Sequence, residues 1–449
     1  MDRRDFLRTV GVGLAGLPFA RQWALAAAEP AAGVKPNIIF ILTDDVGLGD
    51  IGCCGGDAFK TPHIDALAKT GVRFEYSYAT PLCGPSRCQM LTGRYPFRTG
   101  LNSNQSADAV SPADEVMLPT VLKEAGYATA LVGKWGQICL GPGEWGFEEY
   151  LSYQGSGRYW ASQKSGYTCN GKSQELGATE YLPDVMHRFL VDFITRNQAK
   201  PFYVHYSMSH LHGPILRTPD SKDTGPQQDL YADNVVYMDK LVGQLVAELE
   251  RLHLRERTLI VFTGDNGTAR QGDERSTLGG RRIHGKKATM LEGGSRVPLI
   301  ANWPGTTPTG VVNQDLTDFS DFFPTFAALG GAPLPAGVTL DGQSFAAQLK
   351  GEKGRPREWV YVELQGKSYV REARYKLTNS GELFDLKDAP FVEEPLPADS
   401  ADPAIVAVRK RLQEVLNQHP AAPANTAGKP KKPRRKIRQP KQKQQQPKR

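Results

Sequence analysis

The chain has 449 residues, 40% of them hydrophobic, which is enough for a large buried core and too many for one minimal domain. Its 46 glycines and 32 prolines argue against a helical bundle and favour a loop-rich enzyme. The net charge of +7 comes from residues 429–449, which hold eleven basic side chains and no acidic one. The rest of the chain is therefore net acidic, and the sequence indicates no specific nucleic-acid partner.

The first segment, residues 1–28, is expected to be an export signal and not part of the fold. Arg3-Arg4 precedes an apolar stretch over residues 10–20, and residues 24–28 are nearly all small. This order resembles a twin-arginine signal with a small-residue cleavage region. The apolar stretch is shorter than the roughly 20 residues of a membrane span, which disfavours the alternative of an uncleaved anchor. We therefore expect an exported protein, periplasmic or extracellular, with no transmembrane span.

Residues 35–340 are expected to form one α/β domain, because apolar runs typical of buried strands alternate with segments typical of helices. Strands are predicted at 36–42, 127–132, 202–206, 258–263 and 297–301, and helices from 61 onward and at 185–195 and 231–252. Such alternation predicts a mixed, mostly parallel central sheet sandwiched by helices. In such sheets the ligand site lies beyond the carboxyl ends of the strands.

Beyond residue 345 the pattern changes to short alternating segments separated by turn residues, which predicts a small antiparallel subdomain over 345–418. Its strands are expected at 359–364, 368–371, 375–378 and 383–386, with a closing helix at 405–417. The remaining segment, 420–449, is rich in Pro, Gln and Lys and is predicted to be a disordered basic tail. Electrostatic contact with an anionic surface and a solvated tail without a partner are both open readings of it.

Oxygen-bearing side chains follow two of the predicted strands. Asp44-Asp45 comes directly after the first strand, and Asp265-Asn266 follows the strand at 258–263. Parallel strands bring their carboxyl ends to one edge of a sheet, so these side chains are expected to meet there. A set of oxygen donors without His or Cys favours calcium or magnesium over zinc.

A short motif then gives a specific resemblance. The run Cys83-Gly84-Pro85-Ser86-Arg87, followed by Thr92-Gly93-Arg94, resembles the signature of the formylglycine-dependent (type I) sulfatases of the alkaline phosphatase-like superfamily. Other motifs match that family in the same order along residues from about 35 to 390. These motifs are Asp44-Asp45-x-Gly47, Gly133-Lys134-Trp135, Gly264-Asp265-Asn266-Gly267, and Lys287 five residues before Glu292-Gly293-Gly294-Ser295-Arg296-Val297-Pro298.

The resemblance implies that a separate formylglycine-generating enzyme oxidises Cys83 to formylglycine, an aldehyde that hydrates to a geminal diol. One hydroxyl then attacks the sulfur of a sulfate ester, and the second collapses to a carbonyl and expels sulfate. It also implies that Asp44, Asp45, Asp265 and Asn266, together with the modified Cys83, hold a divalent cation that activates the hydroxyl. Calcium is the expected ion and magnesium the alternative.

The resemblance also assigns roles to the basic side chains. Arg87 would orient the diol, while Lys134 and Lys287 would bind the sulfate and offset the charge that builds on the leaving oxygen. His212 stands where the family has a histidine before x-Pro, and it would protonate the leaving alcohol. His210, two residues earlier, is the alternative proton donor.

One position departs from the family pattern. The family usually reads Gly-Lys-Trp-His-x-Gly, whereas residues 133–138 read Gly-Lys-Trp-Gly-Gln-Ile. Gly136 therefore replaces the histidine that normally assists release of sulfate. His210 or a water molecule would have to serve as the base, since the neighbouring amide of Gln137 cannot.

The sequence thus predicts a sulfuric ester hydrolase, an arylsulfatase-like enzyme whose substrate is a sulfated small molecule or polysaccharide. The carbohydrate substrate rests on analogy with exported members of the family. Residues 267–286 are expected to contribute specificity, with Arg281, Arg282 and His284 available for an anionic substrate. Two alternatives are a phosphodiester or phosphonate-ester hydrolase of the same superfamily and a non-catalytic relative that binds polysaccharide.

Overall fold

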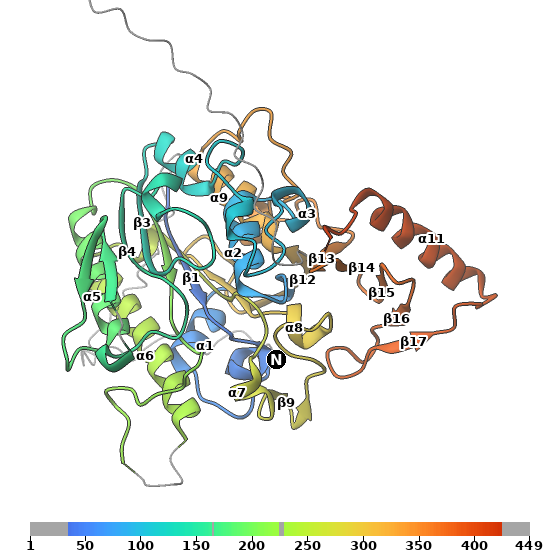
Figure 1. Cartoon of the computed structure of the whole chain (residues 1–449), viewed down its shortest axis with the longest axis horizontal. Coiled ribbons are helices and arrows are strands. Elements are labelled where there is room, and N and C mark those ends of the chain that lie inside the picture. Colours follow the sequence, from blue (N-terminus) through green and yellow to red (C-terminus); the bar gives the residue numbers. More distant parts are fainter. Residues whose placement is uncertain (1–34, 164–165, 224–228, 424–449) are drawn as a thin grey trace, which may run out of the picture.

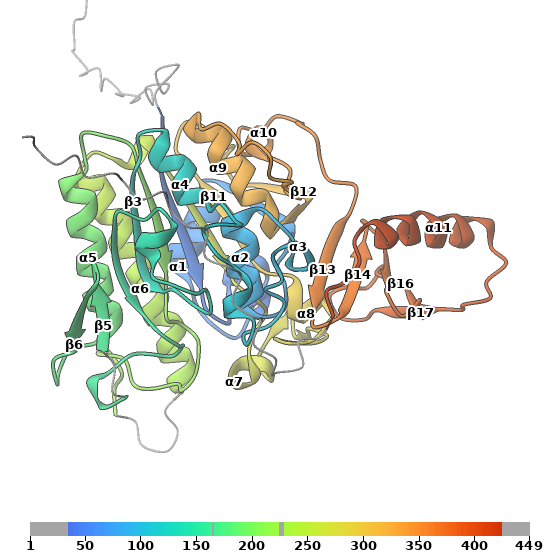
Figure 2. The ribbon, with the colours of Figure 1, turned by 45° about the horizontal axis from the view of Figure 1, so that its top comes forward.

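The structure, a computed structural model, describes residues 35–163, 166–223 and 229–423. A large sheet with helices on both faces forms the body, and a smaller sheet with one long helix extends from its side (Figure 1; Figure 2). The predicted export signal and most of the predicted basic tail lie outside the described residues. No helix in the described part of the chain combines the length and the apolar character needed to cross a membrane.

The large sheet is centred on β1 (Asn37–Thr43), whose seven residues are all buried. β1 pairs in parallel with β7 (Phe202–Ser207) on one side and with β8 (Thr258–Gly264) on the other. The order across the sheet is β12 (Val311–Asp318), β2 (Val72–Tyr78), β11 (Leu299–Asn302), β8, β1, β7, β3 (Ala128–Lys134), β4 (Glu149–Tyr153), β5 (Gly166–Cys169) and β6 (Lys172–Glu175). β11 is antiparallel to both of its neighbours and β5 and β6 are antiparallel, so the predicted mixed, mostly parallel sheet is confirmed.

Alternate residues of β1 face two separate hydrophobic cores, as the pleat of a strand requires. Ile39 and Ile41 pack with α1 (Pro62–Lys69), α5 (Leu182–Arg196) and α6 (Leu230–Arg251). On the opposite face, Phe40 and Leu42 pack with α2 (Cys83–Thr92), α4 (Leu118–Glu124) and α9 (Phe322–Gly330). The sheet is therefore covered by helices on both faces, as the sequence predicts (Figure 2).

The small sheet is antiparallel throughout and carries the predicted closing helix. Its strands are β13 (Val360–Leu364), β14 (Lys367–Arg371), β15 (Tyr375–Thr378), β16 (Leu383–Asp385) and β17 (Glu394–Leu396). α11 (Pro403–Gln418) begins after the capping residue Asp402 and packs Leu412 and Leu416 against this sheet. Shorter elements complete the description: α3 (Pro96–Thr99), α7 (Arg270–Asp273), α8 (Glu292–Ser295), α10 (Ala346–Leu349), β9 (Thr277–Leu278) and β10 (Arg281–Arg282).

Candidate active site

The site begins where the two central strands end. The register of β1 and β8 pairs Thr43 with Gly264, so Asp44 and Asp265 follow side by side. The Asp45 amide donates to Asp265 Oδ1 over 3.1 Å, which ties the two strand ends together. Asp45 has a φ of +65°, a left-handed conformation that Asp tolerates better than most residues and that turns the chain sharply after the strand. The strand ends therefore deliver carboxylates to one point, as the sequence predicts.

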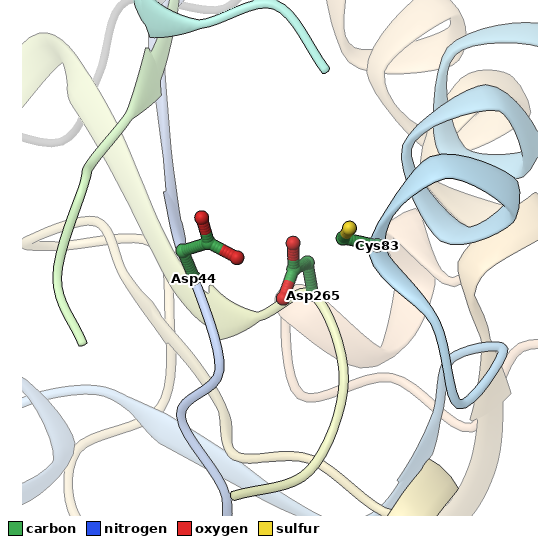
Figure 3. Close-up of side chains that lie close together, drawn as sticks. All are labelled: Asp44, Cys83 and Asp265. Carbon is green, nitrogen blue, oxygen red and sulfur yellow. The ribbon is translucent and has the colours of Figure 1, made fainter. Parts of the chain in front are cut away.

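Cys83 enters the same point from a different layer, at the first residue of α2. Its side chain is buried, and ligand atoms of Asp44, Cys83 and Asp265 all lie within 4.8 Å of one another. Figure 3 shows the three side chains converging from two strand ends and one helix end. The amino end of a helix favours negative charge, so a group built on Cys83 and an anion bound beside it are both placed well.

Arg87 lies one turn further along α2 and is fully buried. Its Nε and Nη2 donate to Asp265 Oδ2 over 3.0 and 2.7 Å, and its Nη1 donates to Ser207. Burial opposes the positive charge, but the carboxylates of Asp265 and Asp44 outweigh it and raise the pKa of Arg87. The guanidinium is therefore a fixed cation of the site.

Two lysines neutralise the aspartates of the first strand end. Lys134, the last residue of β3, donates from Nζ to Asp44 Oδ2 over 2.8 Å with both side chains buried. Burial is the largest single influence on the pKa of Lys134 and lowers it, but the surrounding acidic groups, Asp44 foremost, together raise it by more, so the net shift is upward and the amine stays protonated. Lys287 forms an ion pair with Asp45. Burial lowers the pKa of Lys287, but the surrounding acidic groups, Asp45 and Asp44 foremost, together raise it by more. Both lysines thus remain cations at the edge of the sheet.

Two oxygens of this cluster have no hydrogen-bond donor in the described part of the chain. Asp44 Oδ1 and Asn266 Oδ1 are buried and unpartnered, although Asn266 Nδ2 donates to Asp45 Oδ1 over 2.9 Å. A buried acceptor without a partner is costly unless something else binds it. Carboxylate and amide oxygens directed at one point suit a hard divalent cation. The side chains present therefore fit the metal that the sequence predicts, held by Asp44, Asp45, Asp265 and Asn266.

The two candidate histidines lie in different surroundings. His212 is half-buried, with Nε2 3.8 Å from Asp45 Oδ2 and Nδ1 2.7 Å from the Gly213 carbonyl oxygen. If Nδ1 carries a proton for that carbonyl, Nε2 is left facing the site. The His210 ring is buried among tyrosines and bonds Tyr181, and burial lowers its pKa to about 3. In the described part of the chain the His210 ring makes no hydrogen bond to the cluster, which favours His212 as the proton donor.

The backbone at position 136 has a conformation that favours glycine. Gly136 has a φ of +91°, and a Cβ built on it would lie 3.1 Å from Arg87 Cδ. L-residues rarely adopt such a backbone conformation, so a histidine here would be strained. The glycine that replaces the family's histidine therefore matches the backbone conformation at this position.

Sequence reasoning missed two side chains that touch Cys83. Asn104 Nδ2 lies 3.4 Å from Cys83 Sγ, and Gln137 Oε1 lies 3.7 Å from it. Asn104 sits in a loop without a recognisable pattern, and Gln137 was considered only as a base. Motif spacing holds no signal for either contact, because both depend on how separate loops meet over α2.

In the basic loop at 267–286, the two arginines expected to be available for substrate form ion pairs within the protein while remaining exposed. Arg281 forms a double hydrogen bond with Asp388 of the C-terminal subdomain. Arg282 and Lys286 both pair with Asp273. These ion pairs offset part of the positive charge that the sequence suggested for an anionic substrate.

Comparison with known proteins places these features in one family. The Sulfatase family model matches residues 36–332. N-acetylgalactosamine-6-sulfatase of Canis lupus familiaris is 32% identical over 423 residues, covering 83% of this chain and 79% of the relative. Arylsulfatase A of Homo sapiens is 33% identical over 403 residues, covering 80% and 78%. The crystal structure of Ps i-CgsB in complex with k-i-k-neocarrahexaose superposes with a TM-score of 0.74 at 28% identity, covering 86% of this chain and 92% of that one.

Proposed function

The chain belongs to the sulfatase family and is a sulfuric ester hydrolase, and we propose that it removes sulfate from a sulfated carbohydrate with a nucleophile made from Cys83. The observation that carries this proposal is the convergence of the buried Cys83 side chain with Asp44 and Asp265. A reactive group at this point would lie between oxygen ligands and fixed cations. Such an arrangement suits attack on a tetrahedral, negatively charged ester.

Formylglycine at position 83 fits the chemistry of the surroundings. When present, its hydrated aldehyde supplies one hydroxyl for attack on sulfur and a second for release of sulfate. The thiol alone would be a poor choice, because a sulfated thiol has no comparable route to release. A calcium ion, with magnesium as the alternative, would be held by Asp44, Asp45, Asp265 and Asn266 and would supply Lewis acidity.

The cations of the site would hold the substrate's sulfate and stabilise charge on it. Arg87 is fixed by Asp265, Lys134 by Asp44 and Lys287 by Asp45, so none of them must reorganise when the ester binds. Preorganised donors of this kind each lower a barrier by about 3 kcal/mol in other enzymes. Removal of either lysine is therefore expected to slow the reaction strongly.

His212 would protonate the oxygen of the leaving alcohol. Its Nε2 faces the cluster beside Asp45, and its Nδ1 is held by the Gly213 carbonyl. A general acid must reach the leaving oxygen from a fixed direction, and this contact fixes the ring. The partial exposure of His212 also leaves room for the alcohol portion of a substrate.

A carbohydrate is the substrate class we propose, because a solved relative of similar fold is bound to neocarrahexaose and a second is bound to D-glucosamine-2-N,6-O-disulfate. Export by a twin-arginine signal would bring the enzyme to such substrates. That route transports folded proteins, so a formylglycine-generating enzyme would act on Cys83 before export. The basic residues of 429–449 would add affinity for an anionic polymer or envelope surface.

Paired assays test this function. The purified protein from its native host is given an aryl sulfate, the matching aryl phosphate, and sulfated oligosaccharides, while mass spectrometry follows the Cys83 peptide. We expect sulfate turnover to exceed phosphate turnover and Cys83 to carry the mass of the aldehyde. Faster turnover of the phosphate ester would instead support a phosphoester hydrolase, and absence of both activities a binding protein.

A further inference from the structure

Two side-chain amides cover the Cys83 side chain and have no assigned role. Asn104 reaches Cys83 from the loop after α3, with Nδ2 at 3.4 Å and Oδ1 at 3.7 Å from Sγ. Gln137 reaches it from the loop after β3, with Oε1 at 3.7 Å from Sγ. Within the described residues these amides are the hydrogen-bonding partners of the Cys83 side chain. The nearby cations bond carboxylates instead, Arg87 to Asp265 and Lys134 to Asp44.

The second residue of the cysteine motif makes room for this amide pair. Gly84 donates its backbone N–H to Asn104 Oδ1 over 3.0 Å. A Cβ at position 84 would lie 2.6 Å from Asn104 Oδ1 and 3.4 Å from Gln137 Oε1. The first distance is shorter than van der Waals contact permits, so any side chain at 84 would push Asn104 away. The absence of a side chain at position 84 therefore lets both amides approach residue 83.

We propose that Asn104 and Gln137 position the nucleophilic side chain at residue 83, holding its terminal atoms in the orientation required for attack. This inference rests on the proposed sulfatase function and names two further residues of that site. A carboxamide offers both a donor and an acceptor, so it can hold a hydroxyl in either sense. It remains neutral, and therefore it orients the nucleophile without taking its proton. The role is that of positioning residues, acting through side chain 83.

A simpler reading is that Asn104 only caps the helix. Its Oδ1 accepts the Gly84 N–H in the first turn of α2, as a capping side chain does. The Asn104→Asp variant separates the two readings, because a carboxylate keeps the acceptor for Gly84 and loses the Nδ2 donor that faces residue 83. A cap alone predicts full activity for Asn104→Asp, whereas positioning predicts loss of activity with the fold preserved.

The experiment compares Asn104→Ala, Gln137→Ala and Asn104→Asp with the parent enzyme. Gln105→Ala is the matched control, because Gln105 is an exposed carboxamide in the same loop. For each protein the converted fraction of Cys83 is measured by mass spectrometry, and kcat and KM are expressed per converted site. We expect kcat to fall at least about 10-fold in the three variants, with KM changed less than about twofold and Gln105→Ala unchanged. An unchanged kcat per converted site in both alanine variants would overturn the proposal, as would full activity of Asn104→Asp.

A second measurement does not depend on sulfatase activity. Protein produced without maturation retains the Cys83 thiol, and its alkylation by iodoacetamide can be followed at the Cys83 peptide. Both alanine variants are expected to alter this rate severalfold relative to the parent and to Gln105→Ala, because Sγ loses a covering partner. Equal rates in all four proteins would contradict the contacts themselves. If the parent lacks aldehyde and sulfatase activity while the alkylation rates differ, the proposed function fails and the amide contacts stand.

Discussion

Two buried clusters of charged side chains lie on either side of α2, and they differ in whether every carboxylate oxygen has a hydrogen-bond donor among the described residues. At the strand ends, Asp44 Oδ1 and Asn266 Oδ1 are buried without a donor. Near the C-terminal subdomain, Arg357 donates from Nε to both carboxylate oxygens of Asp321 over 2.9 and 2.8 Å. Its Nη2 donates to the Asp341 carbonyl oxygen over 2.8 Å.

Asp318 completes the second cluster and is equally well satisfied. Its Oδ1 accepts from Gln89 Nε2 over 2.6 Å and from the Ser320 amide over 2.8 Å, and its Oδ2 accepts from the Tyr95 hydroxyl over 3.2 Å. Gln89 belongs to α2, so this cluster joins the helix that carries Cys83 to the start of the smaller sheet. Saturated hydrogen bonding is what a structural role requires.

Burial alone does not distinguish a functional cluster of charged side chains from a structural one. Both clusters are buried and both contain an arginine paired with aspartate. Among the described residues of the two clusters, only the first leaves a carboxylate oxygen without a hydrogen-bond donor, Asp44 Oδ1, and places it beside Cys83. An unpartnered carboxylate oxygen beside a buried cysteine therefore distinguishes the first cluster from the second, and changes in the two clusters should affect different measurements.

The largest effect is expected from Cys83→Ala. Loss of the nucleophile should reduce kcat by on the order of 10⁴-fold or more, because the remaining groups can only bind the ester. Cys88→Ala is the matched control, since Cys88 is a buried cysteine on the same helix. Hydrolysis rates with circular dichroism spectra of both variants check this. Activity that survives in Cys83→Ala would remove Cys83 from the mechanism.

Removal of divalent cations tests the unpartnered oxygens directly. Dialysis against a chelator should abolish activity, and added Ca²⁺ or Mg²⁺ should restore it, because Asp44 and Asn266 supply hard oxygen ligands. Binding of the ion should also raise the unfolding temperature. Calorimetry with and without Ca²⁺ measures the second effect. An enzyme that stays fully active and equally stable in excess chelator would contradict a cation site.

Arg357→Leu should act on stability. It leaves Asp321 buried without its cation, so the free energy of unfolding should fall by about 3–5 kcal/mol. Arg374→Leu is the control, because Arg374 pairs with Asp385 while remaining exposed, and its loss should cost about 1 kcal/mol or less. Urea unfolding gives both values, and kcat per folded molecule should be unchanged. A selective loss of kcat in Arg357→Leu would assign the second cluster to the reaction.

The smallest effect is a pH dependence that involves Asp318. Burial raises the pKa of its carboxyl to about 6, above the ordinary value of 3.8. The group therefore contributes its full stability below about pH 4, and this contribution is lost as the pH rises through about 6. Asp318→Asn should reduce that loss by on the order of 2 kcal/mol. Unfolding free energies at about pH 4 and about pH 8 check this, and an identical pH dependence in the variant would contradict it.

Much of the fold could be predicted because its signals are local. The central strands β1, β3, β7 and β8 are continuous apolar runs, and a run buried on both faces is visible in sequence. The outer strands were not predicted. β5 and β6 are short and mostly exposed, and the first half of β12 is also mostly exposed, so neither apolar runs nor clean alternation mark them.

The site likewise has residues that the sequence could predict and residues that it could not. Asp44, Asp45, Asp265 and Asn266 follow strands that parallel pairing brings together, so sequence order and the family motif predicted where they meet. Cys83 and Arg87 share one helical turn, which a four-residue spacing implies. By itself, the sequence determined that Cys83, the neighbouring basic side chains and the oxygen donors come together, because local spacing and strand order bring them to one point.

Only the tertiary structure decided which groups surround Cys83 and which charges are already paired. Asn104 and Gln137 reach the sulfur from two loops, and neither loop has a periodic pattern. Arg281 pairs with Asp388, more than a hundred residues later, so this ion pair could not be predicted from the loop itself. Contacts between distant segments depend on the packing of the whole chain, and no local spacing encodes them.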